Sequence, residues 1–319
     1  MRTAKLIVAD GGVRVKPTPF SYHAPTSEPE AVALLGELDD ARVLAGGQSL
    51  VPLLNFRKVR CAHLIDLNEI AELAGIQVAD GWLLIGAMTR QRDLAESQLL
   101  AGVSPITREA LHFVGHLATR TRGTLGGSLC NLDPCAELYS ASLLQDAVLH
   151  VKGARGDRQV PIASWPSGYM TPALGADEML TSVSWRVWPP GHGHGFAEFS
   201  HRHHDYAIAT AGALMTGTGD GRIDAVAVAV AGIAPAPVRL SAAEAMLHGE
   251  PGSPGLFAEA AQTAFALEPF SDQVAAQHYP NRFVTVSYRQ RLGVVLTQRA
   301  LALAWERAIT NGKGSDHAV

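Results

Sequence analysis

The sequence lacks the features that mark secreted and membrane proteins. Its 319 residues include only three cysteines, Cys61, Cys130 and Cys135, which cannot all pair with one another. The apolar run near Met1 is too short for the core of a signal peptide. No uncharged run approaches the ~20 residues of a membrane helix, and the closest one, 225–238, is typical of a buried strand. We therefore expect a cytoplasmic protein with reduced thiols and no membrane span.

A strong excess of charge of either sign is also missing. The chain has 26 lysines and arginines against 30 aspartates and glutamates, which gives a formal net charge of −4. Nucleic-acid-binding domains usually carry a basic surface, so nucleic acid is not an expected partner. Hydrophobic residues make up 47% and charged residues 18% of the sequence, which indicates a folded chain rather than a disordered one. At this length we expect two or three domains.

Two glycine-rich segments are present, but their spacing fits neither the Rossmann fingerprint nor the P-loop. In the first, Gly46 and Gly47 stop an apolar run that indicates the end of a buried strand. Consecutive N–H groups in such a turn form a concave nest for anions such as phosphate. The second, 120–138, holds three glycines, small hydroxyl residues and an Asp-Pro pair. Their separation of about 80 residues favours a long ligand between two lobes, although ordinary turns also use Gly-Gly and Asp-Pro.

Apolar periodicity and turn signals predict a mixed α+β fold. The expected strands are 43–45, 62–67, 82–87, 147–151, 179–185, 207–216 and 223–231, the last two forming a hairpin. Ser27 and Thr89 are candidate helix N-caps, and a helix over 105–115 is expected to lead straight into the second glycine segment. Further helices are expected over 241–247, 256–267 and 287–307. The turn-rich stretch 188–195 is the best domain boundary.

The two glycine segments together carry a family resemblance. Ala45-Gly46-Gly47-Gln48-Ser49-Leu50, followed by Thr124-Leu125-Gly126-Gly127-Ser128-Leu129 and Asp133-Pro134, resembles the paired FAD motifs of the molybdenum hydroxylases. Over about 20–304 the chain is similar to their separate FAD-binding medium subunit, of the carbon monoxide dehydrogenase and xanthine dehydrogenase type.

The resemblance implies a domain plan and a set of FAD-binding residues. The plan is a variable leader (1–19), a two-lobed PCMH-type FAD-binding domain (20–190, with lobes of about 20–72 and 73–190), a C-terminal α+β domain of sheet plus helices (196–310) and a tail (311–319). The implied cofactor-binding residues are Ala45, Gly46, Gly47, Gln48, Ser49, Leu50, Thr124, Gly126, Gly127, Ser128, Asn131, Asp133, Glu137, Leu180 and Tyr206.

The segment from His201 to Tyr206 is similar to a family motif whose aromatic residue lies near the isoalloxazine ring. An aromatic face there can pack on the ring and tune its redox behaviour. A core tyrosine at the start of a strand is the alternative. The segment departs from the family pattern, with His201 in place of arginine and His204 in place of glycine, and Tyr139 stands where the family usually has proline.

Other chemical assignments are weaker. Five histidines between His192 and His204 suggest a metal, but His-rich loops usually lack convergent ligands and a supporting shell, so no metal is expected. Cys130 and Cys135 are too few for an iron–sulfur cluster and are expected to pack as small residues. Asp133 and Glu137 could act as an acid–base pair. Because carboxylates accept well from sugar hydroxyls, we assign them to binding instead.

The resemblance implies an FAD-binding electron-transfer subunit with no catalytic residue of its own. A molybdopterin-binding large subunit and a 2Fe-2S small subunit would oxidise the substrate, in a heterotrimer or a dimer of heterotrimers. Electrons would then reach FAD singly and leave toward oxygen, a quinone or a nicotinamide. Two alternatives stay open: an independent FAD-dependent oxidoreductase with its own substrate, and a non-catalytic scaffold that has lost FAD.

Overall fold

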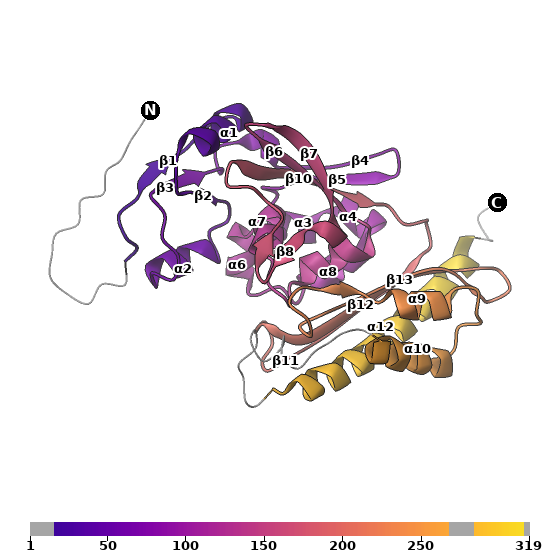
Figure 1. The fold of residues 1–319 in the computed structure, drawn as a ribbon. Coiled ribbons are helices and arrows are strands. Elements are labelled where there is room, and N and C mark those ends of the chain that lie inside the picture. Colours follow the sequence, from indigo (N-terminus) through magenta and orange to yellow (C-terminus); the bar gives the residue numbers. More distant parts are fainter. Residues whose placement is uncertain (1–15, 268–283, 316–319) are drawn as a thin grey trace.

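A three-stranded parallel sheet with the order β1-β3-β2 forms the first lobe (Figure 1). Its elements are β1 (Ser21–His23), α1 (Glu28–Glu37), β2 (Ala41–Leu44), α2 (Leu50–Asn55), β3 (His63–Asp66) and the 3-10 helix η1 (Ala71–Leu73). Leu44 and Asp66 pair at the ends of β2 and β3. Because parallel strands end at the same edge, the first glycine segment leaves the sheet where ligands of open parallel sheets bind. The computed structural model describes residues 16–267 and 284–315.

A five-stranded antiparallel sheet with the order β4-β5-β10-β6-β7 forms the second lobe. Its strands are β4 (Ile76–Ala79), β5 (Trp82–Gly86), β6 (Val148–Gly153), β7 (Gly156–Pro161) and β10 (Glu178–Arg186). The helices of this lobe are α3 (Gln91–Glu96), α4 (Gln98–Val103), α5 (Pro105–Leu111), α6 (Leu117–Arg122), α7 (Leu125–Asn131) and α8 (Glu137–Leu144). A short connection adds η2 (Ile162–Ser164), β8 (Pro166–Gly168) and β9 (Thr171–Pro172). Trp165 and Trp185 are fully buried in the core, where the Trp165 indole donates to the Leu129 carbonyl at 2.9 Å.

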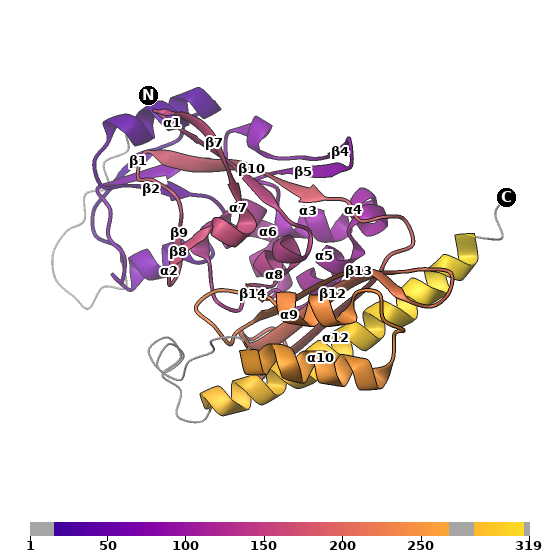
Figure 2. The same ribbon diagram turned by 45° about the vertical axis from the view of Figure 1, so that its right-hand side comes forward.

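Within the described residues, a four-stranded antiparallel sheet and three helices form the C-terminal part. They are β11 (Gly193–Ser200), β12 (Ala207–Gly217), β13 (Ile223–Ala231), β14 (Val238–Arg239), α9 (Ser241–Leu247), α10 (Pro254–Leu267) and α12 (Val286–Ser315). Figure 2 shows α12 running along this sheet beside α10. One face packs on α12 through Ala211 and Ala213, and the other packs on the second lobe through Leu214. Burial on both faces explains why β12 is a continuous apolar run.

Most expected elements are confirmed, including the N-cap position of Ser27, the hairpin of β12 and β13, and the helices α9, α10 and α12. The expected fold class, mixed helices and sheets, is also confirmed. Most of the leader expected over 1–19, and the last residues of the tail, lie outside the described residues. Among the described residues, no helix is both long and apolar enough to cross a membrane.

Some local expectations are wrong, because tertiary contacts override them. Thr89 caps no helix; its hydroxyl bonds instead with the backbone N–H and carbonyl of Gly75, at 3.0 and 3.1 Å. The helix expected over 105–115 ends at Leu111, and α6 follows before the second glycine segment. At the end of the turn-rich stretch 188–195, the last three residues belong to β11, where a β-carbon on Gly195 would lie 2.3 Å from the carbonyl oxygen of Ala300. Glycine there lets α12 pack closely on the strand.

Candidate functional site

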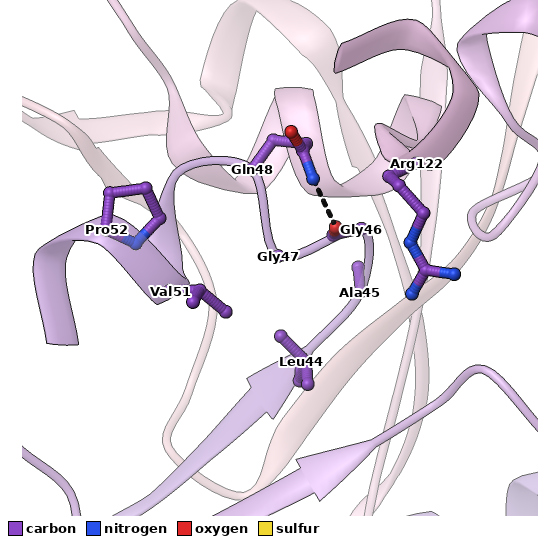
Figure 3. Close-up of a pocket in the computed structure, with 8 residues that line it drawn as sticks. All are labelled: Leu44, Ala45, Gly46, Gly47, Gln48, Val51, Pro52 and Arg122. Carbon is purple, nitrogen blue, oxygen red and sulfur yellow. Dashed lines mark hydrogen bonds between the residues drawn. The ribbon is translucent and has the colours of Figure 1, made fainter. Parts of the chain in front are cut away.

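The loop after β2 opens into a hollow of about 360 Å³ at the edge of the first sheet (Figure 3). The residues that line it are Leu44, Ala45, Gly46, Gly47, Gln48, Val51, Pro52 and Arg122. Gly47 has a φ of 72°, in the left-handed region that favours glycine. The Gln48 side-chain amide donates to the Gly46 carbonyl at 3.2 Å and closes the turn. Four of the predicted site residues, 45–48, therefore share one concave surface.

Several backbone N–H groups of this loop have no hydrogen-bond acceptor in the described part of the chain. In the described part of the chain, no acceptor bonds to the backbone N–H groups of the five consecutive residues 46–50. The Ser49 side chain does not cap α2 either. Of these residues only Gly46 is buried, and a buried N–H without a partner costs about 1–3 kcal/mol. The more exposed N–H groups are open to water or to a ligand. Consecutive amides of this kind fit an anion such as a phosphate group.

The second glycine segment differs from the expected open loop, because Leu125–Asn131 form α7. The Thr124 hydroxyl caps this helix by accepting from the Gly127 N–H at 3.0 Å. The Gly126 N–H donates to the Ala87 carbonyl at 2.8 Å, and the Ser128 N–H to the Thr124 carbonyl at 3.2 Å. The expectation that the glycine amides of both segments face a ligand is therefore wrong for the second segment, whose amides are bonded within the chain.

The glycines of the second segment serve close packing instead. A β-carbon on Gly126 would lie 2.6 Å from that of Ala87, and one on Gly127 would lie 2.8 Å from the Thr124 hydroxyl oxygen. The β-carbon of Ala45 would be in ordinary contact with Gly127, at 3.4 Å. A β-carbon on Gly46 would stand 2.3 Å from the Arg122 carbonyl oxygen. The two segments therefore lie directly against each other, but Gly126 and Gly127 are not among the described residues that line the hollow.

A hydrogen-bond chain that the sequence analysis missed connects the two segments. The Asn68 amide donates to the Ala45 carbonyl at 3.0 Å. Arg90 donates to the Asn68 side-chain oxygen at 2.5 Å and to the Arg122 carbonyl at 2.7 Å. No local motif marks Asn68 or Arg90, and Arg122 lies inside the second segment without any pattern of its own. Only the packing of the two lobes shows that these residues belong to the site.

A second hollow, of about 250 Å³, lies where the second lobe meets the C-terminal sheet. Its lining includes Asp133, Cys135, His201, Tyr206 and Arg289. Tyr206 is 76% exposed, so the alternative of a core tyrosine is wrong. One oxygen of Asp133 accepts from the Cys135 N–H at 3.0 Å, which leaves the rest of the carboxylate able to accept from hydroxyl groups. The predicted site residues thus divide between two hollows.

Four further predicted residues are not among the described residues that line either hollow. Ser128, Asn131 and Glu137 are partly buried on α7 and at the start of α8. Burial raises the pKa of Glu137 to about 7, and the neighbouring charge of Asp133 adds to the effect. Leu180 does not reach either hollow: its side chain is 4% exposed and belongs to the core of the second lobe.

The departures from the family pattern have defined structural consequences. His204 has a φ of 69°, so it adopts the left-handed conformation that glycine favours, which histidine tolerates better than most residues. Its ring stacks on His203 with centroids 4.0 Å apart and meets His116 edge-on at 5.1 Å. Tyr139 is buried within α8 and its hydroxyl donates to the Ile162 carbonyl at 2.6 Å.

Across residues 16–267 and 284–315, no three His, Cys, Asp or Glu side chains are placed to hold a metal ion.

Comparison with known proteins assigns the chain to a family. A family model described as the FAD binding domain in molybdopterin dehydrogenase matches residues 18–185, just over half of the chain. The chain belongs to this family. A second model, described as the CO dehydrogenase flavoprotein C-terminal domain, matches residues 194–304. FAD is therefore the cofactor of this molybdopterin dehydrogenase flavoprotein, and the residues of the first hollow fit a diphosphate group.

Over about half of its length, the chain is similar in sequence to individual subunits of known dehydrogenases. Caffeine dehydrogenase subunit beta from Pseudomonas sp. (strain CBB1) is 39% identical over 171 residues, 53% of this chain and 58% of that protein. The carbon monoxide dehydrogenase medium chain of Hydrogenophaga pseudoflava is 38% identical over 168 residues, 52% of this chain and 58% of that protein. The matched part of this flavoprotein thus spans less than two thirds of these curated relatives.

Solved structures extend the similarity over nearly the whole chain. A carbon monoxide dehydrogenase from Hydrogenophaga pseudoflava, in a form that lacks the Mo-pyranopterin moiety, has a TM-score of 0.84 and 33% identity, covering 91% of this chain and 99% of the matched chain. Quinoline 2-oxidoreductase from Pseudomonas putida 86 has a TM-score of 0.84 and 32% identity, covering 92% and 99%. The two glycine segments and the C-terminal sheet therefore belong to one shared architecture.

Proposed function

We propose that this chain is the FAD-binding electron-transfer subunit of a molybdenum hydroxylase-type dehydrogenase. In this proposal it receives electrons from the iron–sulfur clusters of a partner and passes them through FAD to an external acceptor. The observation that carries the proposal is the row of five loop amides, 46–50, that lack an acceptor within the described residues. The first three of these residues, 46–48, line a hollow. Such a row suits the diphosphate of a dinucleotide.

The same proposal assigns roles to individual residues. The loop 45–50 holds the diphosphate, while Ser128, Asn131, Asp133 and Glu137 bind sugar hydroxyls. Tyr206, exposed in the second hollow, packs beside the flavin ring. FAD, when bound, supplies both one-electron and two-electron chemistry, and the protein supplies its orientation and electrostatic environment. In terms of domains, we assign 20–190 to FAD binding, with lobes of about 20–72 and 73–190, and 196–310 to the C-terminal domain.

Partners are part of the proposal because the named relatives are single chains of dehydrogenases, a subunit beta and a medium chain. We expect a molybdopterin-binding large subunit and a 2Fe-2S small subunit, in a heterotrimer or a dimer of heterotrimers. A cytoplasmic location is also proposed, since Cys61, Cys130 and Cys135 are all free thiols.

Co-purification tests this function directly. The chain, tagged and expressed in its native host, is expected to bring down two partners, and the assembly is expected to show flavin and iron–sulfur absorption. The tagged chain alone is expected to be yellow with noncovalently bound FAD. A colourless chain that ignores added FAD would favour the scaffold alternative and contradict the proposal.

A second candidate, an independent FAD-dependent oxidoreductase, is favoured by one observation. The hollow beside Tyr206 has a volume of about 250 Å³, enough for a small organic molecule next to the proposed ring position. This candidate predicts that the FAD-loaded chain reduces or oxidises a substrate without partners. Flavin reduction that requires the iron–sulfur partner, and fails with the isolated chain, would exclude it.

A further inference from the structure

Among the described residues that line the first hollow, Arg122 is the only charged one. Figure 3 shows its side chain across the hollow from Val51 and Pro52, beside Ala45. Its guanidinium group makes no ion pair or hydrogen bond with any of the described residues, although its backbone carbonyl accepts from Arg90. An exposed arginine without a partner is common on protein surfaces. This one lines the same hollow as Gly46, Gly47 and Gln48, whose backbone N–H groups have no acceptor among the described residues.

The backbone of Arg122 is held firmly against the loop. Its carbonyl oxygen lies so close to Gly46 that a β-carbon there would approach to 2.3 Å. The same oxygen accepts from Arg90 at 2.7 Å, and Arg90 in turn is linked through Asn68 to the Ala45 carbonyl. Arg122 therefore keeps a fixed position relative to the amides, and only its flexible side chain needs to order when a ligand binds.

The local charge favours an anion. Burial, and next the charge of Arg122, lowers the pKa of Arg90. Two guanidinium groups thus repel each other beside the hollow, and a bound anion would relieve that repulsion. Arginine presents a planar fork of donors that matches phosphate oxygens, and hydrogen bonds between charged groups are stronger than neutral ones.

We propose that Arg122 binds the diphosphate of FAD from the side of the hollow opposite Val51 and Pro52, together with the loop amides. This inference rests on the proposed function, since it takes FAD as the ligand of the first hollow. It adds a charged residue to the predicted cofactor-binding set, in which the two glycine motifs contribute glycines and hydroxyl residues but no arginine. Free nucleotides with the same diphosphate, such as ADP, share the recognised chemistry and are expected to compete for the site.

The test compares the full-length wild-type chain with Arg122→Gln. The deflavinated proteins are titrated with FAD by flavin fluorescence, and with ADP as a competitor. Arg122→Gln is expected to weaken FAD binding about 10-fold or more and to weaken ADP binding by a similar factor. The wild type should lose FAD affinity with added salt more steeply than the variant, because one charge pair is missing in the variant. Arg122→Lys should recover part of the affinity, because it keeps the charge without the fork.

Arg92→Gln is the matched control. Arg92 is an exposed arginine on α3, paired with Asp93 and Glu96, and does not line the hollow. It is expected to leave FAD and ADP binding unchanged. If Arg122→Gln binds FAD and ADP as the wild type does, the inference is wrong while the proposed function stands. If FAD binding weakens but ADP binding does not, Arg122 contacts another part of the ligand and the inference is also wrong. A wild-type chain that binds no FAD would refute the proposed function itself.

Discussion

Gly46 and Arg122 touch across the boundary between the two lobes. A β-carbon on Gly46 would stand 2.3 Å from the Arg122 carbonyl oxygen and 2.8 Å from the α-carbon of Gly123. These neighbours are backbone atoms, so they cannot move aside as a flexible side chain could. The hollow of the first lobe is therefore closed on one side by the second lobe, and only glycine allows that approach.

Gly46→Ala is expected to weaken FAD binding about 10-fold or more, because the added methyl group must push the Arg122 backbone away from the loop amides. Overpacking of this kind typically costs about 1–3 kcal/mol, so stability should fall as well. FAD titration and thermal unfolding measure the two effects. Gly102→Ala is the control: it lies in α4 with nothing within 4 Å, so it should leave FAD binding intact and raise stability by about 0.5–1 kcal/mol. A Gly46→Ala chain with wild-type FAD affinity would contradict the assignment of this hollow.

Tyr206→Leu is expected to change the visible spectrum and the reduction potential of bound FAD, because it removes an aromatic face proposed to lie beside the ring. Stability should change by less than about 0.5 kcal/mol, since Tyr206 is 76% exposed. Phe199→Leu is the control, because Phe199 is a 40% exposed aromatic residue that lines neither hollow. Identical spectra and potentials in the wild type and in Tyr206→Leu would show that this tyrosine is not near the flavin.

Glu178→Gln is expected to destabilise the second lobe at neutral pH by about 1–2 kcal/mol. The expected loss is this small because the Arg158 side chain is partly exposed, so solvent screens its ion pair with Glu178. Two hydrogen bonds from Arg158, at 2.6 and 2.7 Å, lower the pKa of Glu178 to about 2. The folded pKa lies below that of the unfolded chain, about 4.3, so the ionised carboxylate stabilises the fold above that pH. This contribution is lost as the pH falls toward 2.

Urea unfolding between pH 7 and 2 measures this effect. The wild type should lose more stability than Glu178→Gln over the acid range, so that the two curves converge. Glu96→Gln, an exposed carboxylate on α3, is the surface control and should change stability little. Parallel curves for the wild type and Glu178→Gln would rule out the ion pair as the cause.

Glu198→Gln is expected to stabilise the protein at alkaline pH. Burial, and next the charge of Glu137, raises the pKa of Glu198 to about 8, and one of its buried oxygens has no partner among the described residues. Here the folded pKa lies above the unfolded one, about 4.3. The folded state therefore holds an extra proton between these values, and stability falls as the pH rises through that window.

The measurement is the free energy of unfolding of both chains from pH 5 to 9. At pH 5 the wild type and Glu198→Gln should be similar, because the carboxyl group is protonated in the fold. At pH 9 the variant should be the more stable of the two. A constant difference across the whole range would show that Glu198 does not titrate in this way.

The sequence could predict those features that depend on local backbone chemistry. Gly46 and Gly47 after an apolar strand give a turn with open amides, whatever surrounds them. The apolar runs of β12 and β13 give a hairpin because their length and turn signal leave few alternatives. The second glycine segment was harder to predict. Thr124 is a good helix cap, but the two glycines after it are equally typical of a turn, and the bond from the Gly126 N–H to the Ala87 carbonyl favours the helix.

By itself, then, the sequence determined that this chain has a bare-backbone turn, a mixed α+β fold and the motifs of a flavoprotein family. Only the tertiary structure decided which backbone N–H groups lack an acceptor and which charged side chain lines the hollow beside them. The contacts among Asn68, Arg90 and Arg122 join residues 22 and 32 positions apart, so they depend on how one lobe packs against the other. No local pattern encodes that packing, because it results from the buried surfaces of both lobes acting together.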